Sequence, residues 1–153
     1  MPASSVEVWG VIADEAAAES QLWADALRRD PEHEPVFSPL ADERWALGLE
    51  TIYEAYLLHY GRPRLFAPRD RHTALLLGDY LYAHGLVRVA EHGEVDVVAE
   101  LAELISVCAQ LRADDSPGDG EACAATAGRL RSGPPADAAE VEQALAAHAG
   151  RVS

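Results

Sequence analysis

Apolar residues recur with the 3.6-residue period of an α-helix along most of this chain, and the alternation of apolar and polar residues typical of a β-strand is missing. Between residues 95 and 112, one such stripe consists of Val97, Val98, Leu101, Leu104, Ile105, Cys108 and Leu111. This period predicts an all-α protein. With 153 residues, the chain suits a single domain that buries about two-thirds of its unfolded-chain surface.

Capping and breaking residues divide the pattern into four expected helices, at residues 5–29, 39–60, 71–92 and 95–112. Ser4 and Glu7 have the spacing of a capping box at the start of the first helix. Ser38 and Asp70 are suited to cap the second and third helices, and Gly93 can end the third in a left-handed conformation.

The composition changes after the fourth expected helix. Residues 114–153 are rich in Ala, Gly, Pro and Asp and hold few large apolar side chains. This composition is typical of short surface helices or of a partly mobile tail, and only residues 137–149 show helical spacing there. The chain is therefore expected to divide into a helical core at residues 1–113 and a loop with short helices at residues 114–153.

Acidic residues outnumber basic residues by 26 to 12, which gives a formal net charge of −14. This balance disfavours a general nucleic-acid surface or an anionic-membrane surface. All basic residues are arginine, so a Schiff-base lysine and a P-loop lysine are excluded. An arginine can still bind a phosphate through its planar, bidentate fork.

The two cysteines, Cys108 and Cys123, have neither a CxxC spacing nor a Cys/His ligand spacing, so we expect two reduced, packed thiols. Residues 1–20 lack the basic flank and the apolar run of a signal peptide. No apolar run in the sequence approaches membrane-spanning length. A cytoplasmic location is the default expectation.

The most hydrophobic stretch is LLLGDYLYAHGL, residues 75–86, in which Asp79 is the only charged side chain. A helix with so little charge is expected to be covered nearly all round, either inside the core or against a second subunit. Asp79 then requires a partner, such as an arginine or a backbone donor. Gly78 lets a neighbouring group approach closely.

This region resembles the central segment of the trans-polyprenyl diphosphate synthases. Members of that family carry a G-K-P element and, after a similar gap, a helix with the pattern G-D-Y-L that is followed by another helix. Here G-R-P stands at residues 61–63 and G-D-Y-L at residues 78–81, and the resemblance covers about residues 40–112. It implies a truncated isoprenoid-synthase-like helical bundle.

The chemistry of that family depends on two aspartate-rich motifs that hold Mg²⁺ on the allylic diphosphate. The first motif would fall on residues 50–54, where the sequence reads ETIYE. Glu50, Thr51 and Glu54 thus form a degenerate motif, with two carboxylates one helical turn apart. The same spacing is also common on a solvated helix face.

Arg62 replaces the lysine of the family's G-K-P element and is the remaining candidate for a diphosphate contact. His59 and Tyr60 stand where family enzymes carry arginines, and the second aspartate-rich motif would fall beyond residue 153. The resemblance therefore implies no catalytic residue, no metal site and no cofactor in this chain. It places Mg²⁺ in a catalytic partner.

In the family, the G-D-Y-L helix and the helix after it form much of the dimer interface. The residues expected at a partner interface are Leu77, Gly78, Asp79, Tyr80, Leu81, His84, Leu101, Ile105 and Cys108. Tyr53, Tyr80 and Tyr82 are candidates for the wall of the tunnel that limits product length, although core packing is their simpler role.

The resemblance implies a regulatory or small subunit of a heteromeric trans-polyprenyl diphosphate synthase. Its catalytic partner, with intact aspartate-rich motifs, would condense an allylic diphosphate with isopentenyl diphosphate, and the small subunit would influence product chain length. Two alternatives stay open. One is a free-standing, diverged prenyltransferase that acts as a homodimer, and the other is a helical module that binds an isoprenoid or a partner protein.

Overall fold

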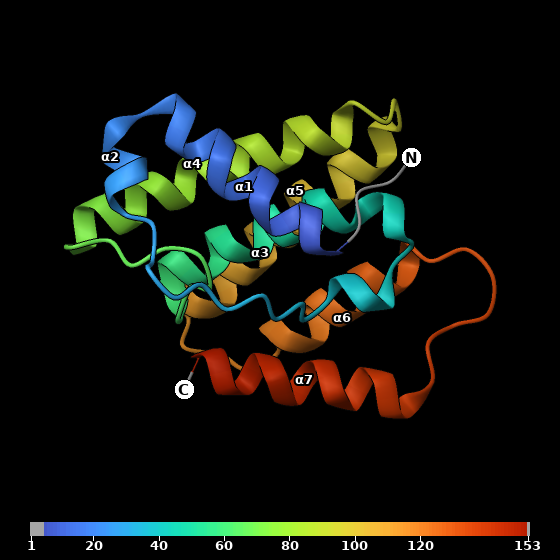
Figure 1. Ribbon diagram of the computed structural model, residues 1–153. Coiled ribbons are helices and arrows are strands. Elements are labelled where there is room, and N and C mark those ends of the chain that lie inside the picture. Colours follow the sequence, from blue (N-terminus) through green and yellow to red (C-terminus); the bar gives the residue numbers. More distant parts are fainter. Residues whose placement is uncertain (1–4, 153) are drawn as a thin grey trace.

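The computed structural model describes residues 5–152, and in this range the regular secondary structure is all helical, apart from a single bridge between Leu27 and Phe66 (Figure 1). This confirms the all-α prediction. The elements are α1 (Ser5–Glu19), α2 (Gln21–Asp25), the 3₁₀ helices η1 (Ser38–Leu40) and η2 (Glu43–Trp45), α3 (Ala46–Tyr60), α4 (Arg71–Ala90), α5 (Val95–Ala113), α6 (Asp119–Arg129) and α7 (Ala138–Val152).

The first expected helix is broken in two at Ser20. Ser20 has extended backbone angles (φ −157°, ψ 138°), and its hydroxyl accepts a hydrogen bond from the backbone N–H of Leu22. Serine competes with the helix in this way and starts a new one by capping it. The single helix over residues 5–29 was therefore a wrong prediction, and Ser4 of the expected capping box lies outside the described residues.

The second expected helix begins later than residue 39, because the chain first makes the two 3₁₀ turns η1 and η2. The Ser38 hydroxyl does not cap a helix and instead donates a 2.6 Å hydrogen bond to Glu50 Oε2. The third and fourth helices are confirmed. Asp70 Oδ1 accepts from the Thr73 N–H at 2.8 Å, and Gly93 after α4 has a φ of +78°.

Helix α3 lies at the centre of the molecule, with α1 and α4 on one side and α6 and α7 on the other (Figure 1). Every residue from Gly48 to Leu58 is buried. Its closest neighbour is α4, and a Cβ added at Gly85 would lie only 2.6 Å from Ile52 Cγ1 and 3.3 Å from the Ile52 backbone nitrogen. The missing side chain at Gly85 therefore allows the two helices to pack closely.

Helix α4, which carries the most hydrophobic stretch, is covered by the chain except along one exposed stripe. Leu77 and Leu81 are fully buried against the rest of the chain, whereas Leu76 is 57% exposed and Val87 is 53% exposed. The alternative in which the chain's own core covers α4 nearly all round is therefore wrong, whereas coverage by a second subunit stays a prediction. The helix that is covered all round is α3.

Residues 114–152 are not separate from the core. Helices α6 and α7 pack beside each other, and Cys123, Ala127 and Ala144 are buried in the same cluster as Tyr56 and Leu57 of α3. Helix α7 also extends beyond the expected residues 137–149. Within residues 5–152, no helix is long and apolar enough to cross a membrane.

Candidate functional site

The two carboxylates of the degenerate ETIYE motif point into the protein. Glu50 is 2% exposed and Glu54 is 0% exposed, so the interpretation of a solvated helix face is wrong. Both residues project from α3, one turn apart, towards the segment that follows the helix. Thr51 between them donates its hydroxyl to the backbone oxygen of Leu47 on the same helix and does not face the carboxylates' partner.

That partner is Arg64, which is completely buried. Its Nη1 lies 2.7 Å from Glu50 Oε1, and its Nε lies 3.1 Å from Glu54 Oε1. The backbone N–H of Arg64 donates to both carboxylate oxygens of Glu54, and the N–H of Leu65 donates to Oε2 at 2.7 Å. With the Ser38 hydroxyl on Glu50 Oε2, all four carboxylate oxygens accept hydrogen bonds from the protein.

Burial opposes the charge on Arg64, but Glu50 and Glu54 outweigh it and raise the pKa of the guanidinium above its ordinary value. The guanidinium also lies over the rings of Trp9 and Tyr53, at 4.6 and 5.1 Å from their centroids. Arg64 therefore supplies the cation that these buried carboxylates require.

Sequence reasoning selected Arg62 in the G-R-P element and missed Arg64. In the structure Arg62 is exposed, and its guanidinium donates to the Gly150 carbonyl of α7 at 2.6 Å. A signal for Arg64 was present in the sequence. Two glutamates lie in the largely apolar stretch LETIYEAYLL, and buried carboxylates require a cation nearby. Arg64 is a candidate for this cation because the apolar residues Leu65 and Phe66 follow it directly.

A second, partly buried polar network joins α3, α5, α6 and α7. The Tyr56 hydroxyl and Arg112 both donate to Asp119 Oδ2, Arg112 from Nη2 at 2.6 Å. His148 Nε2 lies 3.2 Å from the same oxygen, and His148 Nδ1 lies 2.6 Å from the Tyr53 hydroxyl. The network thus ties the C-terminal helix to the central helix.

The charge on Asp119 determines which groups in this network carry protons. Burial opposes its charge, but hydrogen bonds from Tyr56 and Arg112 and the proximity of His148 lower the pKa of Asp119 to about 2. An ionised carboxylate only accepts, so His148 carries its proton on Nε2 and accepts at Nδ1 from Tyr53. Burial lowers the pKa of His148 below its usual value and raises that of Tyr53, so both stay neutral near pH 7.

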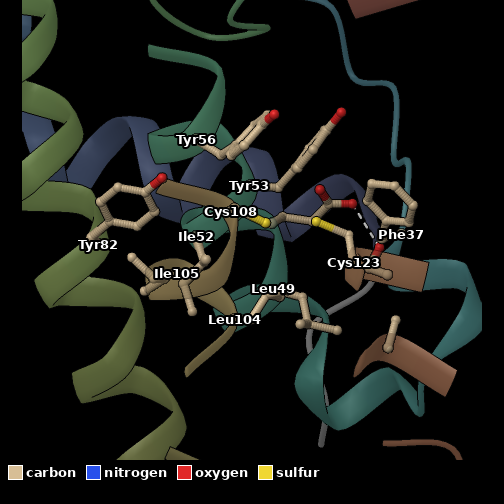
Figure 2. A pocket seen from close by; sticks show the side chains of 13 residues that line it. Phe37, Leu49, Ile52, Tyr53, Tyr56, Tyr82, Leu104, Ile105, Cys108 and Cys123 are labelled. Atoms are coloured by element: carbon tan, nitrogen blue, oxygen red, sulfur yellow. Dashed lines mark hydrogen bonds between the residues drawn. The ribbon is translucent and has the colours of Figure 1, made fainter. Parts of the chain in front are cut away.

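An apolar cavity of about 30 Å³ lies between the two networks, among α3, α4, α5 and α6 (Figure 2). Its lining consists of Phe37, Ser38, Leu49, Glu50, Ile52, Tyr53, Tyr56, Tyr82, Leu104, Ile105, Cys108, Cys123 and Ala127. This volume has room for one or two water molecules and not for an isoprenoid chain. Tyr53 and Tyr82 of the expected tunnel residues line it, whereas Tyr80 packs against Trp23 on another side of α4.

The expected partner interface needs correction. Leu77, Gly78, Leu81, Leu101 and Cys108 are buried by their own chain, and Ile105 faces the cavity. The five buried residues are therefore not available to a partner subunit in this conformation, whereas Ile105 stays partly exposed. The helical period correctly predicted which side of α4 is apolar. It did not indicate that the central helix α3 covers this side.

The polar residues of the same set are more exposed and have partners within the chain. Asp79 Oδ1 lies 3.1 Å from His59 Nε2, and a Cβ added at Gly78 would lie 2.5 Å from the same imidazole ring. Gly78 thus makes room for His59, and Asp79 would form an ion pair with it only if the imidazole were protonated. His84 Nε2 lies 2.9 Å from Glu15 of α1, in an ion pair if His84 is protonated.

Comparison of the chain with protein-family models, with curated proteins and with solved structures gave no match. The fold and the site define an all-α protein with a buried Glu-Arg-Glu network beside a small apolar cavity. Among the described residues, no group of three or more His, Cys, Asp and Glu side chains converges as metal ligands do.

Proposed function

We propose that this chain is the regulatory small subunit of a heteromeric trans-polyprenyl diphosphate synthase. It would pair with a catalytic subunit that condenses an allylic diphosphate with isopentenyl diphosphate, and it would influence the chain length of the product. The observation that carries the proposal is the position of Arg64 between Glu50 and Glu54. By the sequence resemblance, these glutamates correspond to the place of the first magnesium-binding motif of the family enzymes.

Magnesium binds protein carboxylates through oxygens that face an open, hydrated site, and it usually keeps several water molecules. In this chain all four carboxylate oxygens of Glu50 and Glu54 accept hydrogen bonds from protein groups, and a fixed guanidinium lies against them. A divalent cation at this place would be repelled by Arg64 and would have to displace it. This arrangement supports a structural role for the pair and leaves magnesium binding to the catalytic partner.

The exposed face of α4 supports association with another subunit. Leu76, Asp79, Ala83 and Val87 recur at helical spacing on that face and are exposed. We call these four residues the outer face of α4. Family members use the G-D-Y-L helix for dimer contacts, and on this chain the outer face is the part of that helix left for a partner.

The test is co-expression with a candidate catalytic subunit that carries both aspartate-rich motifs, followed by pull-down and a magnesium-dependent prenyl transfer assay. We expect the purified chain alone to be inactive, and the pair to form a complex whose products differ in length from those of the partner alone. Prenyl transfer by the chain alone would contradict the proposal, and so would a partner whose rate and products do not change when this chain is added.

A matched pair of variants tests the surface itself. Ala83→Arg places a long cation on the outer face of α4, while Ala149→Arg makes the same change at an exposed position of α7, on the opposite side of the molecule (Figure 1). We expect Ala83→Arg to lower co-purification of the catalytic subunit at least tenfold and Ala149→Arg to leave it unchanged. Equal effects of the two variants would rule out the outer face as the contact.

The second candidate function is a helical module that binds an isoprenoid, and the apolar cavity beside Tyr53 and Tyr82 favours it. Because the cavity is small, binding would require Tyr82 or the short helix α6 to move. Saturable binding of farnesyl diphosphate to the purified chain, without any effect of the chain on a synthase, would favour this candidate over the first.

A further inference from the structure

Cys108 and Cys123 lie next to each other in the lining of the apolar cavity. Cys108 projects from α5 and Cys123 from α6, two helices that pack together and are joined by the short turn at residues 114–118. Both cysteines are free and buried, both line the cavity, and their sulfur atoms point towards one another in Figure 2. The Cys108 thiol donates to the backbone oxygen of Asp119 at 4.0 Å, one helical turn before Cys123 on α6.

From this arrangement we propose that Cys108 and Cys123 are a redox site, at which a small peroxide such as hydrogen peroxide converts the two thiols into an intramolecular disulfide between α5 and α6. The proposal is independent of the function proposed above. It assigns a modification to two residues that neither the glutamate network nor the outer face of α4 uses.

The chemistry needs one peroxide for each disulfide. The Cys108 thiolate attacks one peroxide oxygen, the O–O bond breaks, and the released hydroxide takes up a proton to leave as water. Cys108 is then a sulfenic acid. The Cys123 sulfur attacks the Cys108 sulfur, the S–O bond breaks, and a second water leaves with the proton of the Cys123 thiol. Two thiols are oxidised in total, and one peroxide is reduced to two waters.

The surroundings favour Cys108 as the attacking sulfur. The neighbouring Cys123 thiol lowers the pKa of Cys108, although burial and the nearby Asp119 oppose this effect. Arg112, one turn further along α5, also favours the thiolate. The Cys108 sulfur beside it and burial raise the pKa of the Cys123 thiol, so Cys123 stays protonated until it resolves the sulfenic acid.

Access for a small oxidant comes from the weak packing of α6. The buried residues of this helix are Gly120, Cys123, Thr126 and Ala127, and none of them has a large apolar side chain. Turns flank the helix on both sides, with Asp115 at a φ of +52° and Gly118 at +117° before it. A helix held by so little apolar area opens locally at low free-energy cost. The open state exposes both thiols together, because they lie side by side in the lining of the same cavity.

The experiment treats the folded 153-residue chain with hydrogen peroxide and follows thiols, intact mass and tryptic peptides. We expect both thiols to disappear together and the intact mass to fall by two hydrogens. Trypsin cleaves after Arg88, Arg112 and Arg129, so the oxidised protein should give peptides 89–112 and 113–129 linked to each other. A reductant should separate these peptides.

A disulfide that closes a loop of this size also stabilises the fold. Fourteen residues separate the two cysteines, and we expect the melting temperature to rise by about 5–10 °C on oxidation. The rise should be absent in Cys108→Ala and in Cys123→Ala, and each of these variants should retain one oxidisable thiol. The main result rests on the native sequence, so it stands even if a variant folds poorly.

Three outcomes would overturn the proposal. The first is survival of both thiols at peroxide concentrations that oxidise the same chain in urea. The second is addition of oxygen atoms to the sulfurs without loss of hydrogens, and the third is a disulfide that links two copies of the chain. Linked peptides 89–112 and 113–129 in the monomer are the only result that supports it.

Discussion

Arg64 Nη1 lies 2.7 Å from Glu50 Oε1 in a part of the protein from which solvent is excluded, and the same guanidinium binds Glu54 through Nε. One cation thus serves two carboxylates that are one helical turn apart on the central helix. Breaking such a network by removing one member leaves an uncompensated buried charge, which is strongly destabilising. Stability measurements are therefore a direct test of this relationship.

Arg64→Met should lower the free energy of unfolding by about 3–5 kcal/mol, because two carboxylates would remain buried without a cation. The control is Arg62→Met, which removes an exposed arginine two residues away and should cost less than about 1 kcal/mol. Urea unfolding followed by circular dichroism measures both. If both variants lost the same free energy of unfolding, the buried network would not stabilise the fold more than an exposed arginine does.

Stability should fall as the pH drops from about 7 to about 5. Burial lowers the pKa of His148 and of His59 below the usual value of 6.5, so the unfolded chain takes up these protons before the folded chain does. Their stabilising contribution is therefore complete above pH 6.5 and is lost progressively below it. Thermal melts at a series of pH values measure this dependence.

The variant His148→Gln separates the two histidines in that experiment. Glutamine can accept from Tyr53 and donate to Asp119 but does not titrate. The slope of stability against pH between 7 and 5 should become shallower in this variant and should not vanish, since His59 remains. An unchanged slope would show that His148 does not titrate differently in the folded and unfolded states.

Leu77→Arg should unfold the monomer, because Leu77 is fully buried against the chain's own core. Its neighbour Leu76 is 57% exposed, so Leu76→Arg should retain the helical circular dichroism spectrum and a melting temperature close to that of the unmodified protein. If Leu77→Arg instead gave a folded protein that had only lost a partner, the described packing of α4 on α3 would be wrong.

Gly85→Ala should cost about 1–3 kcal/mol, because the new methyl group meets Ile52 on α3, including its backbone nitrogen, and must push the helices apart. Gly128→Ala is the matched change on α6, where a Cβ meets nothing within 4 Å. That variant should be neutral or slightly stabilising, since alanine favours a helix over glycine. Denaturant midpoints compare the two variants.

The sequence was sufficient to predict the helices that are marked by local signals. Asp70 caps α4 through a hydrogen bond to Thr73, three residues away, and Gly93 takes its positive φ just after the helix ends. Both features depend on neighbours along the chain, which a sequence displays directly. The break at Ser20 is local as well, but serine is common within helices, so its capping role there was not evident.

Only the tertiary structure decided the partners of the side chains. Glu50 and Glu54 show the same one-turn spacing whether they face water or the core, and Arg64 binds them because the segment after α3 turns back along that helix. Likewise, the helical period of residues 71–92 indicates that one side of α4 is apolar, but it does not indicate whether α3 or another subunit covers that side. Helical periodicity reports which residues share a face, whereas burial and ion pairing depend on contacts between segments that are distant along the chain.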